Sequence, residues 1–597
     1  MTRIGAIARA VVVLLMAALL AACVDRPAPR QPPPPPPTTV APAEPTELVI
    51  GIDDLGAGFN PHLLAHQSVV TTALATLVLP SVFRPDETGT LHLDPTIATS
   101  ATVVATEPFT VSYELNVKAS WSTNAPIAAE DFVYLWEQMR SQSGTVDAAG
   151  YKLITDVRSR AGGKAVDVVF SRPYPQWQQL FSALLPAHIL KDAPGSWTGG
   201  LAGGLPASGG PFRIASVDRA RGELLLARND LYWATPTALD QIVLRRVDPT
   251  TMADGLRAGG VDVGLPAASP AVREALAALG PGVRIQDAPR PVVTGLGMRS
   301  DAGPVSDPRV RQGIAWTLDR EALRATIAPD ALPADAFGLA PSEPGYAPTA
   351  PDGAPVRPDP GAAERAFAAA GYARDGDGRW SRDGQPLRLV VGAAAERPQD
   401  VRLAEAVAAQ LDAAGIGAVV VAPPAVDLFG GQAVPATPPP TTAAPTPTAT
   451  PNLSPSPTPS TVPTMTPTPA PAPGGGVRVD LMVLPRVVGG DLGSRLASDY
   501  GCPRATTGVA DPPATPTGFC FPALQPILSR LLTGPADPET VAAVERVLWA
   551  QLPALPLFQP VTLVVSTPTA DAATGIGPGP LGTGPVTGAQ RWVQPGG

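Results

Sequence analysis

The folded part of the chain begins with alternating segments of strand and helix character. TELVIGI at 46–52 has the composition of a buried strand, and after a Gly-containing turn the apolar positions of 68–78 recur at helical spacing. Short runs rich in Val, Ile and Leu predict further strands at 224–227, 241–245, 387–391, 416–422, 479–484 and 563–566. Because strands and helices alternate, the pattern indicates an α/β or mixed α+β protein with more than one sheet.

Four helix starts are predicted from Asp-Pro pairs. In such a pair the Asp side chain accepts hydrogen bonds from the first unpaired amides, and Pro occupies the first helical position without losing a bond. The pairs are Asp248-Pro249, Asp307-Pro308, Asp359-Pro360 and Asp537-Pro538. Apolar residues at helical spacing follow each pair, so each helix is expected to have one apolar face.

The N-terminal 22 residues have the pattern of an export signal. Arg3 and Arg9 precede an apolar run that ends at Ala22 and is too short for a bilayer span, which needs about 20 residues. Leu-Ala-Ala followed by Cys23 resembles the lipobox of bacterial lipoproteins. The resemblance implies a cleaved signal peptide at 1–22 and a lipid anchor on Cys23. The alternative is an ordinary secretory signal in which Cys23 falls by chance.

Two segments concentrate the prolines, of which the chain has 76. The segment 23–45 contains six consecutive prolines and predicts a stiff tether that favours polyproline II. The segment 435–476 is rich in Pro, Thr and Ser, and with so few apolar side chains it cannot offset its ordering entropy, so we expect a disordered loop between two strands. Its composition resembles O-glycosylated stalks, and an unmodified spacer fits equally well.

Charge and motif content exclude several function classes. The chain carries 43 Lys and Arg against 52 Asp and Glu, a net charge of −9, with no basic patch that could follow a nucleic acid. No nucleophile elbow, phosphate-binding loop or zinc-protease motif occurs, and the four His have no ligand spacing. We therefore predict neither an enzyme nor a cofactor nor a metal site.

The remaining cysteines, Cys502 and Cys520, lie in a chain predicted to be exported. Thiols tend to oxidise outside the cytoplasm, so we expect these two to form a disulfide. Two isolated thiols, or half of a metal site, is the alternative.

One segment resembles a known family. ASWSTNAPIAAEDFVYLWEQMR at 119–140 is similar to the W-S-x-G-x-P-x-x-A-x-D-F-x-Y-x-W segment of family 5 extracellular solute-binding proteins, the peptide and nickel receptors of ABC importers. Ala128 stands where the family commonly has a hydroxyl cap. Further stretches resemble the family in the right order, at 208–214 with 225–245, 254–264, 305–323, 359–380 and 552–560.

The resemblance implies a two-lobed periplasmic-binding-protein-like fold. Lobe I is expected from 46–93, 207–289 and 555–597, a subdomain on it from 94–206, and lobe II from 290–554, interrupted by 435–476. A peptide-class solute would bind in the cleft between the lobes. A monomer anchored at the outer face of the bacterial cytoplasmic membrane would deliver it to an ABC permease and ATPase. The alternative function is an envelope adhesion or scaffold lipoprotein without transport.

The same resemblance suggests ligand-binding residues. In peptide-binding members an Asp after a late strand pairs with the ligand's α-ammonium. Asp491 follows a Gly-Gly turn at the nearest position, and Asp499 beside Tyr500 is the second candidate. In lobe I, His66 and Gln67 precede the helix predicted from Ser68, at an end of the helix that often faces a cleft. Solvated loop or cap carboxylates are the alternative for both Asp residues.

We predict that Cys23→Ser removes the protein from the membrane fraction or leaves an uncleaved precursor, because the anchor needs the thiol. Membrane fractionation with an immunoblot for precursor size measures this. Normal processing with unchanged membrane retention contradicts the lipoprotein hypothesis.

Overall fold

The computed structural model describes residues 45–86, 88–193, 195–430, 434–435, 476–503, 505–506, 509–510 and 516–595. The predicted signal peptide with Cys23, nearly all of the tether, and the loop 435–476 apart from its ends lie outside the described residues. The ends of that loop are joined, because β20 (Val434–Pro435) pairs with β21 (Gly476–Val477). The segment is therefore an insertion between neighbouring points of the fold.

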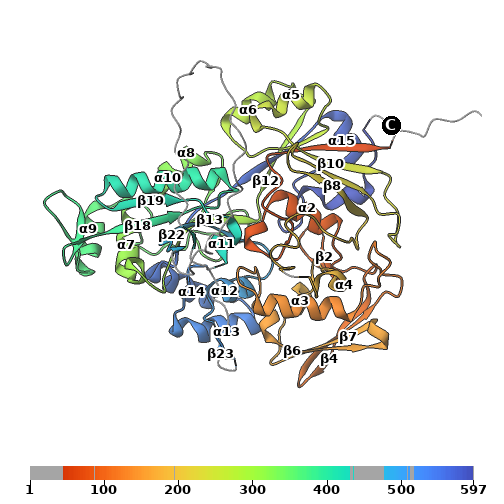
Figure 1. The fold of residues 1–597 in the computed structure, drawn as a ribbon, viewed down its shortest axis with the longest axis horizontal. Coiled ribbons are helices and arrows are strands. Elements are labelled where there is room, and N and C mark those ends of the chain that lie inside the picture. Colours follow the sequence, from red (N-terminus) through yellow and green to blue (C-terminus); the bar gives the residue numbers. More distant parts are fainter. Residues whose placement is uncertain are drawn as a thin grey trace, which may run out of the picture. The chain divides into compact units, whose positions relative to one another are not determined.

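A seven-stranded sheet forms the centre of lobe I (Figure 1). In spatial order its strands are β12 (Arg284–Pro289), β26 (Val561–Ser566), β11 (Val263–Leu265), β1 (Glu47–Ile52), β10 (Gln241–Arg246), β9 (Glu223–Arg228) and β8 (Phe212–Asp218). The first strand pairs in parallel with β10 and β11, and the outer pairings are antiparallel. The strands predicted at 46–52, 224–227, 241–245 and 563–566 are all in this sheet.

A six-stranded sheet forms the centre of lobe II. Its order is β14 (Leu332–Pro333), β25 (Ala554–Gln559), β13 (Val292–Met298), β22 (Leu481–Val487), β18 (Arg388–Gly392) and β19 (Gly417–Val421). The strands β18, β19 and β22 are parallel, which requires crossover connections and is typical of an α/β lobe. Strands predicted at 387–391, 416–422 and 479–484 correspond to these three.

The subdomain contains a four-stranded antiparallel sheet. Its order is β4 (Ala98–Thr106), β5 (Phe109–Leu115), β7 (Ala165–Phe170) and β6 (Ile154–Arg160). The helix α3 (Ala129–Ser141) packs against β6 and β7. Two smaller sheets pair β2 (Phe83–Pro85) with β3 (Leu91–Leu93) and β23 (Ala505–Thr506) with β24 (Val509–Ala510). In a third, β16 (Trp380–Arg382) lies between β15 (Ala373–Arg374) and β17 (Gln385–Pro386).

The Asp-Pro pairs start helices as predicted. Three lead directly into α7 (Pro308–Thr317), α9 (Pro360–Ala369) and α14 (Pro538–Gln551), and the fourth leads through the 3-10 turn Pro249–Thr251 into α5 (Met252–Arg257). In each case the Asp side chain accepts a backbone N–H of the first turn. Further helices are α2 (Val69–Leu77), α4 (Ala187–Leu190), α6 (Pro270–Ala277), α8 (Arg320–Ile327), α10 (Pro398–Ala413), α11 (Ala425–Phe429), α12 (Leu492–Tyr500), α13 (Gln525–Thr533) and α15 (Pro568–Thr574).

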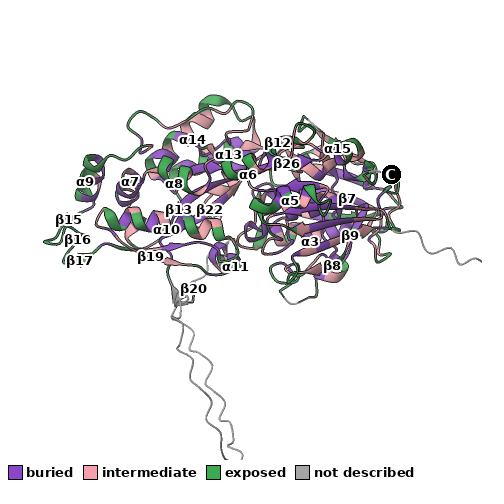
Figure 2. Cartoon of the chain, turned by 90° about the horizontal axis from the view of Figure 1, so that it is seen from above, coloured by how far each residue is buried: buried purple, intermediate pink, exposed green. Residues whose placement is uncertain are grey.

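The hydrophobic core shows which parts of the chain pack together. One cluster of buried side chains extends without a break from the seven-stranded sheet into the subdomain, from Leu48 to Trp121 and Phe170. A second cluster belongs to lobe II and includes Phe337 and Trp549. Figure 2 shows the buried strands of each lobe between helices with exposed outer faces. The subdomain therefore shares the core of lobe I.

The chain crosses between the lobes twice, and one crossing differs from the sequence prediction. The first lies at Arg290, between β12 and β13. The second lies at Pro560, whereas the sequence placed residues from 555 onward in lobe I. β25 pairs with β13 of lobe II through Thr294 and Phe558, and an apolar composition alone does not specify which sheet accepts a strand.

Asp131 joins the family-like segment to the subdomain core. Its carboxylate accepts hydrogen bonds from Trp121 Nε1 (3.2 Å), the Ala128 amide (3.0 Å) and the Ala187 amide (2.9 Å). Asp131 thus accepts a hydrogen bond from the backbone amide of Ala128, the N-cap residue of α3. Ala128 has no side-chain hydroxyl that could cap the helix itself. Burial raises the pKa of Asp131 to about 6, and the three donors oppose that shift.

We predict that Asp131→Ala lowers the free energy of unfolding by about 3–5 kcal/mol, because it leaves three buried donors unpaired. Urea unfolding followed by circular dichroism measures the loss. Glu130→Ala, one residue earlier and exposed, is the matched control and is expected to change stability by less than about 0.5 kcal/mol. Equal effects of the two substitutions contradict this role.

Candidate functional site

A cavity of about 1700 Å³, including its solvent-open part, lies between the lobes; we call it the main cavity. Lobe I and its subdomain contribute the start of α2, Asp147 and Tyr174, and lobe II contributes the segment Val487–Asp491 and Ser494. The C-terminal residues Pro580–Thr583 complete the wall. Residues far apart in sequence therefore enclose one space.

A second cavity of about 810 Å³, including its solvent-open part, shares part of this wall; we call it the side pocket. Val146, Asp147 and Val487 line both cavities. The side pocket lies between the subdomain segment 144–147 and strands β13, β22 and β25 of lobe II. Asp147 thus lies where the two cavities meet.

Direct hydrogen bonds join the two lobes beside these cavities. From the subdomain, Tyr174 Oη lies 2.6 Å from Ser494 Oγ, and the Ala149 amide donates to Ser498 Oγ at 3.0 Å. From lobe II, Arg397 Nη2 donates to the Leu64 carbonyl of lobe I at 3.1 Å. The lobes are therefore in contact in this conformation, and the cavities lie inside the interface.

The structure gives Asp491 two roles. It is the N-cap of α12, because its Oδ2 accepts the Ser494 amide at 2.7 Å, and it also lines the main cavity. The cap role corresponds to the alternative considered from the sequence. The position at the cavity corresponds to the ligand-binding hypothesis, which stays a prediction.

Asp499 and Tyr500, at the C-terminal end of α12, line the side pocket rather than the main cavity. Burial raises the pKa of Asp499 to about 7, and the positive charge of Arg486 opposes the shift. Tyr500 is buried, with its ring 6.0 Å from that of Phe337 in an edge-on arrangement. Asp499 is thus a carboxyl group that is easily protonated near neutral pH.

The structure separates His66 from Gln67. His66 is 1% exposed, lines neither cavity, and accepts the Asn60 amide on Nδ1 at 3.1 Å, so its assignment as a ligand-binding residue is corrected to a structural one. Burial lowers the pKa of His66 to about 4, which keeps the ring neutral. Gln67 does line the main cavity, while its Nε2 donates to the Pro61 carbonyl at 2.7 Å.

Asp147 is the residue that sequence reasoning missed. It has a φ of 53°, in the left-handed region that Asp tolerates better than most residues, and its side chain is exposed within the cavities. Partial desolvation by the surrounding cavity walls raises its pKa to about 6, while Arg495 opposes the shift and nearby Asp491 adds to it. The sequence showed a Gly-containing loop after α3 but gave no sign that this loop faces lobe II.

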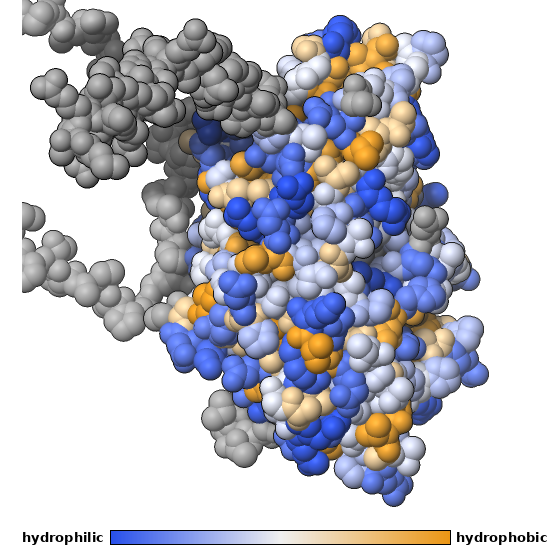
Figure 3. Space-filling view, turned by 90° about the vertical axis from the view of Figure 1, so that its right-hand side faces the viewer, coloured by the Kyte–Doolittle hydropathy of each residue, from blue (hydrophilic) through white to orange (hydrophobic). Residues whose placement is uncertain are grey.

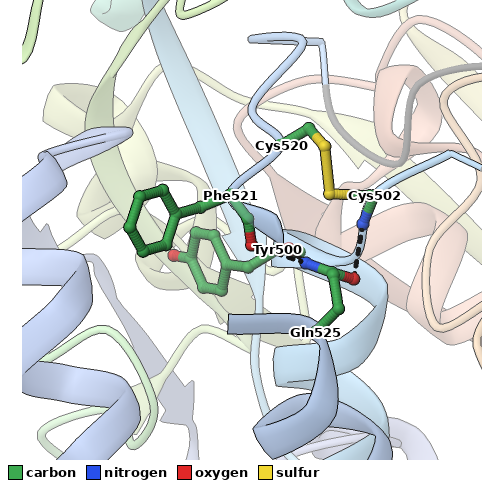
Figure 4. Close-up of a disulfide and its surroundings, with 5 residues drawn as sticks. All are labelled: Tyr500, Cys502, Cys520, Phe521 and Gln525. Carbon is green, nitrogen blue, oxygen red and sulfur yellow. Dashed lines mark hydrogen bonds between the residues drawn. A yellow bond between two sulfur atoms is a disulfide. The ribbon is translucent and has the colours of Figure 1, made fainter. Parts of the chain in front are cut away.

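The structure joins Cys502 and Cys520 in a disulfide, with 4.6 Å between their Cα atoms (Figure 4). Gln525 of α13 supports the site of the bond, because its Oε1 accepts the Cys502 amide at 2.8 Å and its Nε2 donates to the Tyr500 and Phe521 carbonyls. The disulfide therefore fixes the chain directly after Tyr500, next to the side pocket.

Within the described residues, no helix is long and apolar enough to cross a membrane, and no group of three or more His, Cys, Asp or Glu is placed to hold a metal ion. On the face shown in Figure 3, apolar residues are scattered among polar ones. We therefore take the main cavity and the side pocket, which lie between the lobes, as the candidate binding site.

The structure has two lobes, each built on a central sheet, with two chain crossings and a cavity between them. This arrangement is typical of two-lobed solute-binding proteins. The chain belongs to the bacterial extracellular solute-binding proteins of family 5, whose model matches residues 92–450. It is 35% identical to the "Probable monoacyl phosphatidylinositol tetramannoside-binding protein LpqW" of Mycobacterium tuberculosis, over 93% of this chain and 92% of that relative. It is 24% identical to the oligopeptide-binding protein OppA of Mycobacterium bovis, over 57% and 58%.

Solved structures of low identity share the fold. The oligopeptide-binding protein AppA of Bacillus subtilis, in complex with a nonapeptide, has a TM-score of 0.68 at 14% identity, with 92% of this chain and 100% of that chain covered. A mannohexaose-bound periplasmic oligopeptide-binding protein of Thermotoga maritima has a TM-score of 0.63 at 18% identity, with 88% and 92% covered. These comparisons confirm the predicted family and the two-lobed mixed α/β fold.

We predict that Asp499→Asn stabilises the ligand-free protein at pH 8 but not at pH 4.5. The folded pKa of Asp499 lies above its unfolded value, so its contribution to stability is lost as the pH rises through about 7. Replacing the charge removes that loss, and we expect a gain in Tm of about 1–3 °C at pH 8. Calorimetric scans of both proteins across this pH range measure it, with the exposed Asp192→Asn as control. A gain that is the same at both pH values contradicts the assignment.

Proposed function

We propose that this protein is an extracytoplasmic receptor that encloses a peptide-class solute between its lobes and delivers it to an ABC importer. The observation that carries the proposal is the placement of carboxylates in the cavity wall. Asp147 and Asp491 line the main cavity, and Asp147 and Asp499 line the side pocket. Carboxylates held in a partly desolvated cavity favour a ligand that brings a positive charge.

The proposed position of the ligand's α-ammonium is between Asp147 and Asp491. Both residues line the same cavity, and they are close enough for Asp491 to raise the pKa of Asp147. An ammonium group placed there relieves the repulsion between the two carboxylates and forms charge-assisted hydrogen bonds with them. The position of both residues in one cavity wall supports this choice.

A glycolipid is a second candidate ligand. It is favoured by the relative with 35% identity over 93% of this chain, whose name specifies a monoacyl phosphatidylinositol tetramannoside. Such a ligand carries a phosphate, which gains nothing from the cavity carboxylates. The two candidates therefore differ in the sign of the ligand charge that the cavity prefers.

The proposed anchor is the lipid on Cys23, with 23–45 as the tether that holds the lobes away from the membrane. Support comes from the lipobox-like sequence and from the extracellular family to which the chain belongs. The anchored receptor acts as a monomer, and its transport partners are a permease and an ATPase.

We predict that Asp491→Asn weakens binding of a free-amine tetrapeptide about thirtyfold, or about 2 kcal/mol, because one charge-assisted contact is lost. Asn caps a helix as well as Asp does, so α12 is expected to stay intact. Titration calorimetry with the purified protein measures the affinity, and the N-acetylated tetrapeptide is the control ligand.

Equal losses of affinity for the free and the acetylated peptide, or no loss, contradict the role of Asp491.

Mass spectrometry of the ligand retained through purification tests the wider proposal. Retained peptides support it. A retained mannosylated phosphoinositide supports the second candidate, and an empty protein that binds neither ligand supports the scaffold alternative.

A further inference from the structure

The C-terminal segment 578–586 reaches from lobe I to lobe II. Its end belongs to lobe I, because Val586 and the later Trp592 are buried in the core cluster of that lobe. Thr76 of α2 also donates from Oγ1 to the Thr583 carbonyl at 3.2 Å, which attaches the segment to lobe I a second time. The segment is therefore held on lobe I at its C-terminal side.

Leu581, in the middle of this segment, contacts lobe II. Its partly buried side chain packs against an apolar cluster, which we call the socket, made of Val293, Ala334, Ala340 and Val488. All four socket residues belong to lobe II and are at most 2% exposed. Lobe I thus places an apolar side chain on a buried apolar cluster of the other lobe, and the removal of that side chain from water stabilises the contact.

The turn that carries Leu581 is fixed by its own backbone. The amides of Thr583 and Gly584 both donate to the Pro580 carbonyl, at 3.1 and 2.8 Å. Gly579 has a φ of 65° and lies so close to the Gly584 carbonyl that a Cβ on Gly579 would clash with it. Leu581 therefore loses little conformational freedom when it docks in the socket.

The contact reaches the segment that carries Asp491. A Cβ added at Gly489 would lie 3.7 Å from Leu581 Cδ2, which is van der Waals distance. Gly489 and Gly490 have φ values of 93° and 71°, and two successive glycines leave a turn free to change conformation unless a neighbour packs on it. Asp491 follows directly as the N-cap of α12. Leu581 thus packs on the turn that positions a proposed ligand-binding carboxylate.

The same segment forms part of two cavity walls. Pro580, Leu581 and Thr583 line the main cavity and also a third cavity of about 840 Å³, including its solvent-open part, which we call the hinge cavity. Arg290 and Pro291 of the first chain crossing line the hinge cavity as well. On this side the wall of the main cavity is therefore a segment of lobe I whose central side chain is docked on lobe II.

We propose that Leu581 is a positioning residue, which docks in the socket when the lobes close, holds the two lobes together and fixes the turn before Asp491. The contact favours the closed form for every ligand alike, because Leu581 adds an apolar contact between the lobes and no charge to the cavity. Its effect on peptide affinity rests on the proposed function, whereas the contact between the lobes does not.

Hydrogen exchange followed by mass spectrometry on the ligand-free, full-length protein tests the contact between the lobes. In Leu581→Ala we expect amides of the lobe II segment 487–496 to exchange about fivefold faster, because a contact supplied by lobe I is lost. Leu581→Met keeps the apolar volume and is expected to restore slow exchange. If the Ala variant does not fold, Leu581→Val gives a smaller change in the same direction.

Leu225→Ala is the matched control. Leu225 is also a partly buried leucine of lobe I, in β9, and it lines none of the three cavities. This variant is expected to leave exchange in 487–496 unchanged. The same rise in both Ala variants, or no rise in Leu581→Ala, overturns the role of Leu581, because neither result shows a specific contact with lobe II.

Titration calorimetry with tetra-alanine and N-acetylated tetra-alanine gives the second measurement. Leu581→Ala is expected to weaken both peptides by a similar factor of about five, since it shifts the balance between open and closed forms. A loss for the free-amine peptide alone overturns the closing role. If the wild-type protein binds neither peptide, the peptide proposal fails, and the exchange experiment still decides whether Leu581 joins the lobes.

Discussion

Arg290 is the residue on which the relation between the two lobes depends. It lies at the first chain crossing, and its amide donates to the carbonyl of Pro560 at the second crossing (2.8 Å). Its Nε donates to Thr562 Oγ1 of β26, and its Nη2 lies 3.4 Å from Asp53 Oδ2, directly after β1. Through its backbone amide and its side chain, Arg290 thus ties both crossings to lobe I. The strands that leave this point, β13 and β25, form a wall of the side pocket, so the shape of that pocket is set from the hinge.

The charged forms of two carboxyl groups that line the cavities are disfavoured by their surroundings. Asp147 and Asp499 each have a raised pKa because the surrounding protein removes water without supplying a full set of donors. Asp131, which has three donors, shows a similar shift for a residue in the closed core. The difference is access, since Asp131 has its donors from the protein, whereas Asp147 faces open space that a ligand can fill.

Much of the fold could be predicted from local sequence, because the relevant interactions are local. An Asp-Pro pair specifies a helix start through contacts within one turn, and all four pairs did so. The assignment of β25 was wrong because sheet membership depends on a partner strand far away in the sequence. His66 and Asp147 show the same limit in the site. Whether a side chain faces a cavity or packs under a neighbouring loop depends on how the lobes come together.

The shared core of lobe I and the subdomain has a consequence for motion. Tyr174, Ala149 and Arg172 all belong to that one body, and their partners Ser494, Ser498 and Ser529 lie on two helices of lobe II that pack on each other. When two rigid bodies meet through several contacts, these contacts form and break together. Closure of this receptor is therefore expected to behave as a cooperative two-state step, with no stable half-closed intermediate along this edge of the interface.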